Sequence, residues 1–166
     1  MPIICRLLGL RADAAAALKT DPTTLPSHVA DCDRHTELYW YWHGIDYLLS
    51  QAEAPAAVHC LRVGGIELSR PADLPPTRLH LPVPLQQAAA ALNEVAPEAL
   101  FAGYDPATMD AAHIYPERWS ALAGQHDIIS DLLEHYAHLQ EFAVNRAAED
   151  RAMLVLYERR EDETGF

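Results

Sequence analysis

Two groups of histidine, tyrosine and carboxylate side chains lie close enough in the sequence for acid–base chemistry. His43 is followed by Asp46 three residues later, and His113 is followed by Tyr115 and Glu117. A histidine beside a carboxylate can accept and return a proton near neutral pH. Histidines that complete the edge of a core are the commoner case, so a structural role is the competing interpretation.

The sequence carries no motif for a nucleophile or for phosphate binding. It has no G-x-S-x-G, and Cys5, Cys32 and Cys60 stand in no catalytic context. The pair Gly64-Gly65 indicates a turn, not a phosphate-binding glycine loop. We therefore predict no catalytic residue and no cofactor. The candidate residues for binding a ligand or partner are Tyr39, Trp40, His43, Asp46, His113 and Tyr115.

A metal site is a further hypothesis for one predicted helix. Asp131, His135 and His138 lie at i, i+4 and i+7 and so share a helix face. Imidazole and carboxylate groups bind divalent metals, but this spacing lacks the H-E-x-x-H arrangement of zinc proteases. An i,i+4 pair of Asp131 and His135 is also typical of a solvated helix face. We favour the solvated pair and predict no metal ligand.

Five consecutive aromatic or histidine residues, 39–43, lie within a helix predicted over residues 37–50. Leu38, Trp42, Ile45 and Leu49 follow the spacing of one buried helix face. Trp40 would point roughly 160° away from Trp42 at 100° per residue. An exposed tryptophan is a candidate docking residue for a partner. The alternative is that another segment, such as the proline-rich residues 71–84, covers it.

The elements that must position these residues indicate an α+β fold. Residues 21–35 are predicted to be a loop, residues 56–63 a strand or a helix, and residues 70–84 an extended surface run with five prolines. We expect a small antiparallel sheet that includes the first and last strands and packs under a layer of helices. The domain would span residues 1–160, with a charged tail at 161–166. The predicted strands are 3–8 and 153–157, and the predicted helices are 11–20, 37–50, 84–95, 97–101, 105–112, 117–121 and 126–150.

Charge limits the classes of partner. The 166 residues include 24 acidic and 12 basic side chains, for a net charge of −12. Such a charge repels nucleic acid and anionic membranes but attracts a basic protein. Protonation of all nine histidines would change the net charge to −3, so association at low pH and a homo-oligomer stay open. Three unpaired cysteines and the lack of a signal peptide or long apolar run favour the cytoplasm.

Residues 104–119 form the stretch with the most helix boundary signals. Asp105 can cap a helix whose first residue is Pro106. That helix should end near residue 112, because Tyr115 precedes a proline and is excluded from the helical region. Trp119 should pack inward, and Tyr115 should bury its ring while its hydroxyl finds a hydrogen-bond partner.

The same stretch, Y-D-P-A-T-M-D-A-A-H-I-Y-P-E-R-W, resembles the signature of a bacterial family of unknown function, the YfbM-like proteins (domain of unknown function 1877). The segments 42–49, 64–65, 132–136 and 151–155 also resemble the tryptophan helix, the diglycine, the last helix and the last strand of that family. His113 stands where many relatives have glycine, which would suit a left-handed helix end. The resemblance implies a compact α+β domain and no known activity.

Two hypotheses for function follow. The first is a non-enzymatic, acidic protein-binding module, with an immunity or antitoxin-like protein that neutralises a basic toxin as its specific form. The alternative is a small-molecule-binding protein or minor enzyme. Its pocket would lie between the Trp42 helix and residues 104–119 and would be lined by Tyr39, His43, His113 and Tyr115.

Overall fold

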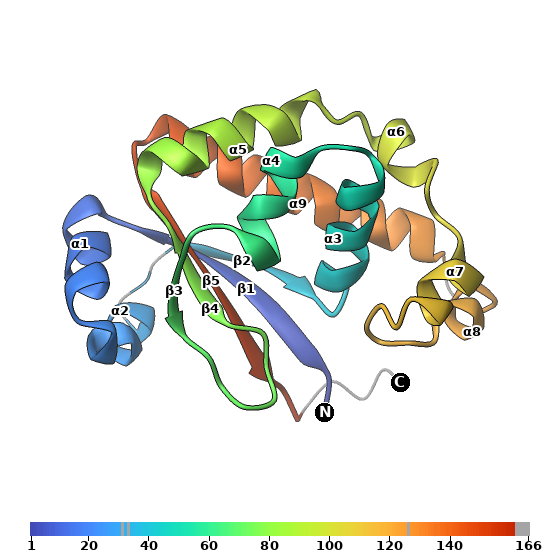
Figure 1. The fold of residues 1–166 in the computed structure, drawn as a ribbon, viewed down its shortest axis with the longest axis horizontal. Coiled ribbons are helices and arrows are strands. Elements are labelled where there is room, and N and C mark those ends of the chain that lie inside the picture. The colour runs from blue at the N-terminus through green and yellow to red at the C-terminus, as the bar shows by residue number, and fades with distance from the viewer. Residues whose placement is uncertain (31, 33, 126, 162–166) are drawn as a thin grey trace.

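The first and last strands of the chain lie side by side at the centre of one antiparallel sheet (Figure 1). The computed structural model describes residues 1–30, 32, 34–125 and 127–161. Within these residues the strand order is β2-β1-β5-β4-β3. The strands are β1 (Ile3–Leu10), β2 (His35–Tyr39), β3 (Ile66–Ser69), β4 (Thr77–His80) and β5 (Ala152–Arg159). The predicted α+β class, with both of these strands in the sheet, is confirmed.

The two central strands are apolar along their length because both faces of the sheet are covered. Successive side chains of a strand point to opposite faces. Met153, Val155 and Tyr157 therefore enter the larger core, whereas Leu154 and Leu156 enter a smaller core on the other face. The sheet thus lies between two layers of helix.

The larger core is covered by the helices that follow β2 in the chain, and α1 and α2 lie on the other side of the sheet (Figure 1). The smaller layer consists of α1 (Ala12–Thr20) and α2 (Leu25–Ala30). The larger layer consists of α3 (Trp42–Gln51), α4 (Pro55–Val58), α5 (Pro82–Glu94), α6 (Pro97–Phe101), α7 (Pro106–Ala111), α8 (Trp119–Ala123) and α9 (Ile128–Ala148). No helix in the described part of the chain is both long enough and apolar enough to cross a membrane.

The predicted helix over residues 37–50 is wrong in its first third. Residues up to Tyr39 form the edge strand β2, and the helix begins only at Trp42. Leu38 is buried in either conformation, so the apolar spacing did not separate them. Pairing with β1 satisfies the backbone of the strand, and Tyr39, with a φ of 45°, turns the chain into the helix.

Three other predictions need correction or completion. The predicted loop 21–35 contains α2 and the first residue of β2. Residues 56–63 are helical, ending in a π-helical turn over His59–Val63. The proline-rich run 70–84 includes β4, because Thr77, Leu79 and His80 are buried in the sheet. Apart from Glu161, the predicted tail 161–166 lies outside the described residues.

Residues 104–119 fold largely as predicted. The Asp105 carboxylate accepts hydrogen bonds from the N–H groups of Ala107 and Thr108, at 3.0 and 3.3 Å, and so caps α7. α7 ends at residue 111, close to the predicted boundary. Asp110 then accepts a hydrogen bond of 2.6 Å from the Trp119 N–H at the start of α8. The inward packing of Trp119 is confirmed, since this side chain is fully buried.

Candidate functional site

The start of α3, the loop after α7 and the start of β1 meet at three hydrogen bonds. The Tyr115 N–H donates to Nδ1 of His43 at 3.0 Å, and the Ile3 N–H donates to the Tyr115 hydroxyl at 2.8 Å. Nε1–H of Trp42 donates to the Ile3 carbonyl at 3.1 Å. The Trp42 ring stacks on the rings of His43 and Tyr115. The predicted hydrogen bond of the Tyr115 hydroxyl is confirmed, and this contact ties the three segments together.

His43 is a neutral hydrogen-bond acceptor in this arrangement. Its Nδ1 accepts the Tyr115 N–H, so the proton of the neutral ring lies on Nε2. Burial, with the nearby Arg62 charge second, lowers the pKa of His43 to about 4, and Glu117 opposes this shift. At neutral pH the ring is therefore a weaker base than an ordinary histidine, which argues against general base catalysis by His43.

His113 lies apart from this contact. Its side chain is 79% exposed, and Nδ1 is 2.9 Å from the Glu117 carboxylate. Its φ of 53° is the left-handed conformation for which a glycine would be suited. Trp42 stacks on Tyr115 between the α3 helix and residues 104–119, where we predicted a pocket lined by Tyr39, His43, His113 and Tyr115. The pocket that His43 lines contains none of the other three residues, so the predicted convergence of the four is wrong.

Trp40 is buried, so the prediction of an exposed docking tryptophan is also wrong. Its side chain is 8% exposed and stacks on Tyr41, with 3.8 Å between the ring centroids. The Trp119 ring packs against it at a tilt, with 5.6 Å between centroids. The residue lies in the turn between β2 and α3, where helical angles do not apply. Tyr41 and Trp119 of α8 pack against it.

Tyr39 belongs to a second aromatic group, beside α9. The Tyr41 hydroxyl donates to Asp131 at 2.7 Å, and His135 stacks on Tyr41 and meets Tyr39 edge to face. Nδ1 of His135 is 2.7 Å from the Asp131 carbonyl oxygen. Asp131 and His135 are thus engaged in structural contacts. Within the described residues, no group of three or more His, Cys, Asp or Glu side chains is placed to hold a metal ion.

Asp46 of α3 is a buried carboxylate that pairs with a half-exposed arginine. Its carboxylate is 1% exposed and lies 2.7 Å from Nε of Arg62. Burial raises the pKa of Asp46, and Arg62 opposes that shift. Burial also raises the pKa of the neighbouring Cys5 and Tyr157 well above their usual values, which argues against a thiolate nucleophile here.

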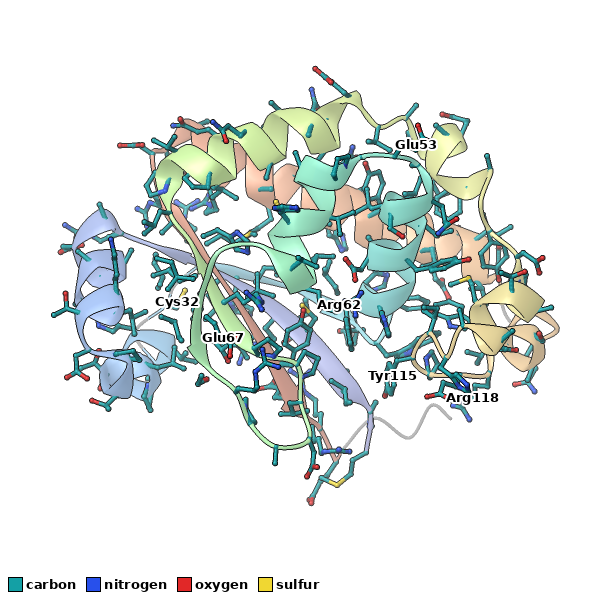
Figure 2. The ribbon with its side chains drawn as sticks, viewed as in Figure 1. Cys32, Glu53, Arg62, Glu67, Tyr115 and Arg118 are labelled. Atoms are coloured by element: carbon teal, nitrogen blue, oxygen red, sulfur yellow. The ribbon has the colours of Figure 1, made fainter. Side chains whose placement is uncertain are left out.

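His43 does line a pocket, on the side of α3 that faces the β3–β4 hairpin. The cavity has a volume of about 510 Å³. Arg62 and Glu67, labelled in Figure 2, come from the π-helical turn and from β3. Glu67 is paired with two further arginines of the wall. The lining residues are Trp42, His43, Arg62, Val63, Arg70, Leu74, Pro75, Pro76 and Arg78.

Sequence reasoning missed these three arginines. Arg62, Arg70 and Arg78 follow one another at intervals of eight residues, in a segment with Glu67 and Asp73 as its acidic residues. These arginines make residues 62–78 a basic segment within an acidic chain, and that local excess of positive charge could have indicated the site. The convergence itself depends on the hairpin folding back toward the π-helical turn, which local patterns do not specify.

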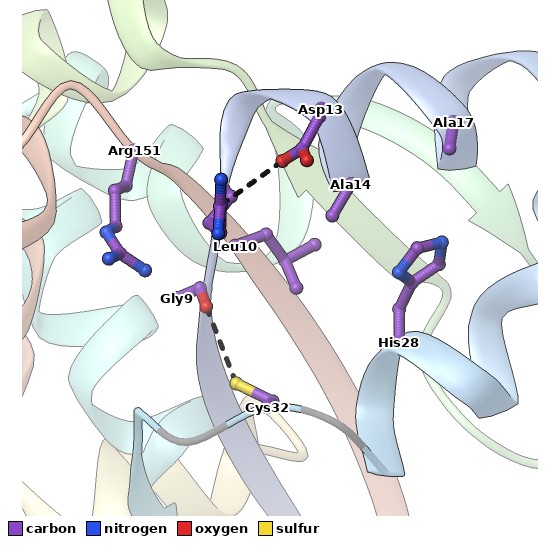
Figure 3. A pocket seen from close by; sticks show the side chains of 9 residues that line it. Gly9, Leu10, Asp13, Ala14, Ala17, His28, Cys32 and Arg151 are labelled. Carbon is purple, nitrogen blue, oxygen red and sulfur yellow. Dashed lines mark hydrogen bonds and ion pairs between the residues drawn. The ribbon is translucent and has the colours of Figure 1, made fainter.

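A separate pocket lies between β1, α1 and α2 (Figure 3). Its volume is about 640 Å³. Arg11 pairs with Asp13 at 3.5 Å, and the Cys32 thiol donates to the Gly9 carbonyl at 3.4 Å. Arg151, on its wall, pairs with Glu149 at 3.1 Å. Arg11, Asp13, Cys32 and Arg151 already have partners, so we assign this pocket no chemistry.

Comparison with known proteins places the chain in a family. The family described as "Domain of unknown function (DUF1877)" matches residues 1–156. This chain belongs to the DUF1877 family. Its structure is similar to that of a protein of unknown function, YfbM from Escherichia coli, with a TM-score of 0.71 and 14% sequence identity over 93% of this chain and 99% of YfbM. No curated protein matches.

The likeness to YfbM supports the DUF1877 fold and goes no further, because the identity is low. The resemblance seen in the sequence is confirmed at the level of the family. The family description names no activity, so any functional conclusion must come from the side chains of this chain. Two features remain for that purpose: the charge of the helical layer and the arginine-lined pocket.

Proposed function

We propose that this protein is a non-enzymatic binding module that recognises a basic protein partner through its acidic helical layer. The specific form that we propose is an immunity or antitoxin-like protein that neutralises a basic toxin. The buried Trp40 moves the proposed docking surface away from residues 39–43. The proposal rests on the concentration of negative charge in the helices that cover the larger core.

The helices that cover the larger core hold most of the negative charge. Residues 82–148, from the start of α5 to the end of α9, contain nine acidic residues and two basic residues, Arg118 and Arg146, a net charge of −7 out of −12. Asp127, Glu134 and Glu141 are exposed and follow one another at intervals of seven residues. That spacing places them along one line of α9, with a drift of about 20° per interval.

The ion pairs described for nine arginines do not use the carboxylates of residues 82–148. Their carboxylate partners are Asp13, Glu37, Asp46, Glu67, Glu149 and Glu158. Exposed Val144 lies on α9 next to the line of Glu134 and Glu141 and supplies apolar contact area. An acidic surface with apolar points favours a basic protein and speeds its association. The nine arginines are Arg6, Arg11, Arg34, Arg62, Arg70, Arg78, Arg146, Arg151 and Arg160.

Calorimetric titration with basic proteins tests the proposal. Lysozyme, cytochrome c and a histone serve as probes, and ovalbumin serves as an acidic control. We expect micromolar or tighter binding to a basic probe, weakened strongly between about 20 and about 300 mM NaCl because salt screens the charges. The immunity form further predicts that co-expression protects cells from a basic toxin encoded beside its gene.

A pair of charge-matched variants separates a docking surface from net charge. Glu134→Gln with Glu141→Gln removes two charges from α9, and Asp73→Asn with Glu161→Gln removes two exposed charges elsewhere. The α9 variant should bind about tenfold or more weakly, and the control should change little. Equal losses in both variants, or no binding to any basic probe at low salt, would sink the proposal.

A further inference from the structure

The pocket lined by Arg62, Arg70 and Arg78 has a net positive charge, although the protein as a whole is acidic. Arg62, Arg70 and Arg78 lie on its wall, and the carboxylates that pair with them are Asp46 and Glu67. Three positive charges therefore meet two negative ones. Guanidinium groups match the planar oxygens of carboxylates and phosphates and bind them in pairs of hydrogen bonds.

Several donors of this pocket lack an acceptor of equal strength. The bond to Asp46 occupies Nε of Arg62 and leaves the four N–H donors of its terminal nitrogens. Nε of Arg78 is buried and has no hydrogen-bond partner among the described residues. The proton on Nε2 of His43 adds a neutral donor. A buried donor without an acceptor is unfavourable, and an oxygen anion is the ligand that would satisfy such a set.

Part of the lining is apolar. Leu74, Pro75 and Pro76 form a half-buried stretch between β3 and β4, and Trp42 also lines the pocket. The volume of about 510 Å³ is within the range of small-molecule sites. A ligand that fits both the charged and the apolar lining carries an anionic group and a compact carbon skeleton.

We propose that this pocket binds a small organic anion, with a carboxylate or phosphate group on Arg62, Arg70 and Arg78. Its carbon skeleton would lie against Leu74, Pro75 and Pro76. Glu67 occupies donors of Arg70 and Arg78 in the free protein, so it competes with the ligand and limits its affinity. This site is separate from the acidic surface of α9, and its test does not depend on the basic-protein proposal.

Titration of the whole chain with benzoate, phenyl phosphate, inorganic phosphate and benzyl alcohol tests the pocket. We expect benzoate or phenyl phosphate to bind with a Kd below about 1 mM. Benzyl alcohol, which has the ring without the charge, should not bind measurably. A preference for phenyl phosphate would identify a phosphate monoester site, and a preference for benzoate a carboxylate site. Absence of binding by both anions would overturn the proposal.

Substitutions on the pocket wall should move the affinity in opposite directions. Arg70→Gln removes an exposed arginine and should weaken binding about tenfold, because a charged hydrogen bond is lost. Glu67→Gln should tighten binding several-fold, because it frees donors of two arginines. Lys19→Gln and Glu161→Gln, which make the same changes of charge on exposed residues elsewhere, should leave the affinity within about twofold.

Arg11→Gln distinguishes this pocket from the one in Figure 3. If that variant loses binding while Arg70→Gln does not, the anion occupies the other pocket and the proposal is wrong. Nuclear magnetic resonance supplies a readout that needs no variant. The Nε–H signal of Arg78 should shift on addition of the anion, and an unchanged signal would count against the site.

Discussion

At the scale of single residues, the side chains that first suggested chemistry serve mainly as structural contacts. His43 accepts a hydrogen bond from the Tyr115 N–H, and the Tyr115 hydroxyl accepts one from the Ile3 N–H. Asp46 forms an ion pair with Arg62. The two contacts of Tyr115 join segments that are far apart in the chain. The polar groups that remain available for a ligand belong to arginines that the acid–base patterns did not include.

His43 should make stability depend on pH. Its pKa is lowered to about 4 in the folded protein and returns to about 6.5 in the unfolded chain. Between these values the unfolded state binds a proton that the folded state does not bind. The stabilisation is therefore fully present above pH 6.5 and is lost as the pH falls toward 4. Chemical denaturation should show a lower free energy of unfolding at pH 5 than at pH 7.

His43→Asn provides the control for this effect. The amide oxygen of asparagine can accept the Tyr115 N–H but does not titrate. The loss of stability between pH 7 and pH 5 should be smaller in the variant by about 1 kcal/mol. His80, whose pKa is also lowered to about 4 by burial, continues to contribute in both proteins. An identical loss in both proteins would contradict the assignment to His43.

At the scale of elements, the packing of α3 against α8 depends on a missing side chain. A Cβ on Gly44 would lie 2.5 Å from the Trp119 ring, closer than van der Waals contact allows. Gly44 is therefore the position on α3 that admits the indole. Trp119 in turn donates to the Ile114 carbonyl at 2.9 Å, which fixes the loop that carries Tyr115.

Gly44→Ala should destabilise the protein although alanine is the better helix former. Crowding against Trp119 should cost about 1–3 kcal/mol, more than the roughly 1 kcal/mol gained from helix propensity. Thermal unfolding and the tryptophan fluorescence spectrum would measure the effect. Ala52→Gly, at the end of α3, gives a reference for a change at the helix terminus. A higher melting temperature for Gly44→Ala would contradict this prediction, because it would mean that Trp119 shifts to accept the methyl group without loss of stability.

The elements also show how far the sequence predicts the structure. Periodicity located α9, predicted over residues 126–150 and observed at Ile128–Ala148. Its buried side chains Leu132, Tyr136, Leu139, Ala143 and Arg146 follow the helical spacing. Helix-end chemistry located the Asp105 cap. The boundary at Tyr39 was missed because Leu38 and Trp42 fit a strand followed by a helix as well as one helix. The positive φ of Tyr39 has no local signal in its residue type.

The candidate site was predicted less well than the fold, for a related reason. Trp40 and the arginines of the pocket are placed by segments distant in the sequence, so neither the burial of the first nor the convergence of the others could be derived locally. Contacts within one helix end, such as those of Asp105, follow from short-range spacing. Contacts between β3, the π-helical turn and α3 do not.

At the scale of the whole molecule, two electrostatic effects oppose each other. A net charge of −12 destabilises the folded state by repulsion, and nine arginines form ion pairs that stabilise it. Salt weakens both. Because most of these ion pairs are partly solvent-exposed and contribute little individually, repulsion among the unpaired acids of the helical layer should dominate.

The melting temperature should therefore rise as NaCl increases from about 10 to about 200 mM. The rise should be smaller in Glu134→Gln with Glu141→Gln, which carries less negative charge on α9. Differential scanning calorimetry would measure both proteins at each salt concentration. A melting temperature that falls with salt would mean that the ion pairs outweigh the repulsion.

The central pairing of β1 with β5 has a consequence for how the chain acquires its structure. Ile3 pairs with Arg159, so the middle of the sheet joins strands that are separated by nearly the whole chain. During synthesis β1 has its edge partner β2 early, but both cores stay open until β5 has left the ribosome. Closing so long a loop is slow in comparison with local helix formation. The apolar faces of the helical layer should therefore stay exposed to solvent until β5 pairs with β1.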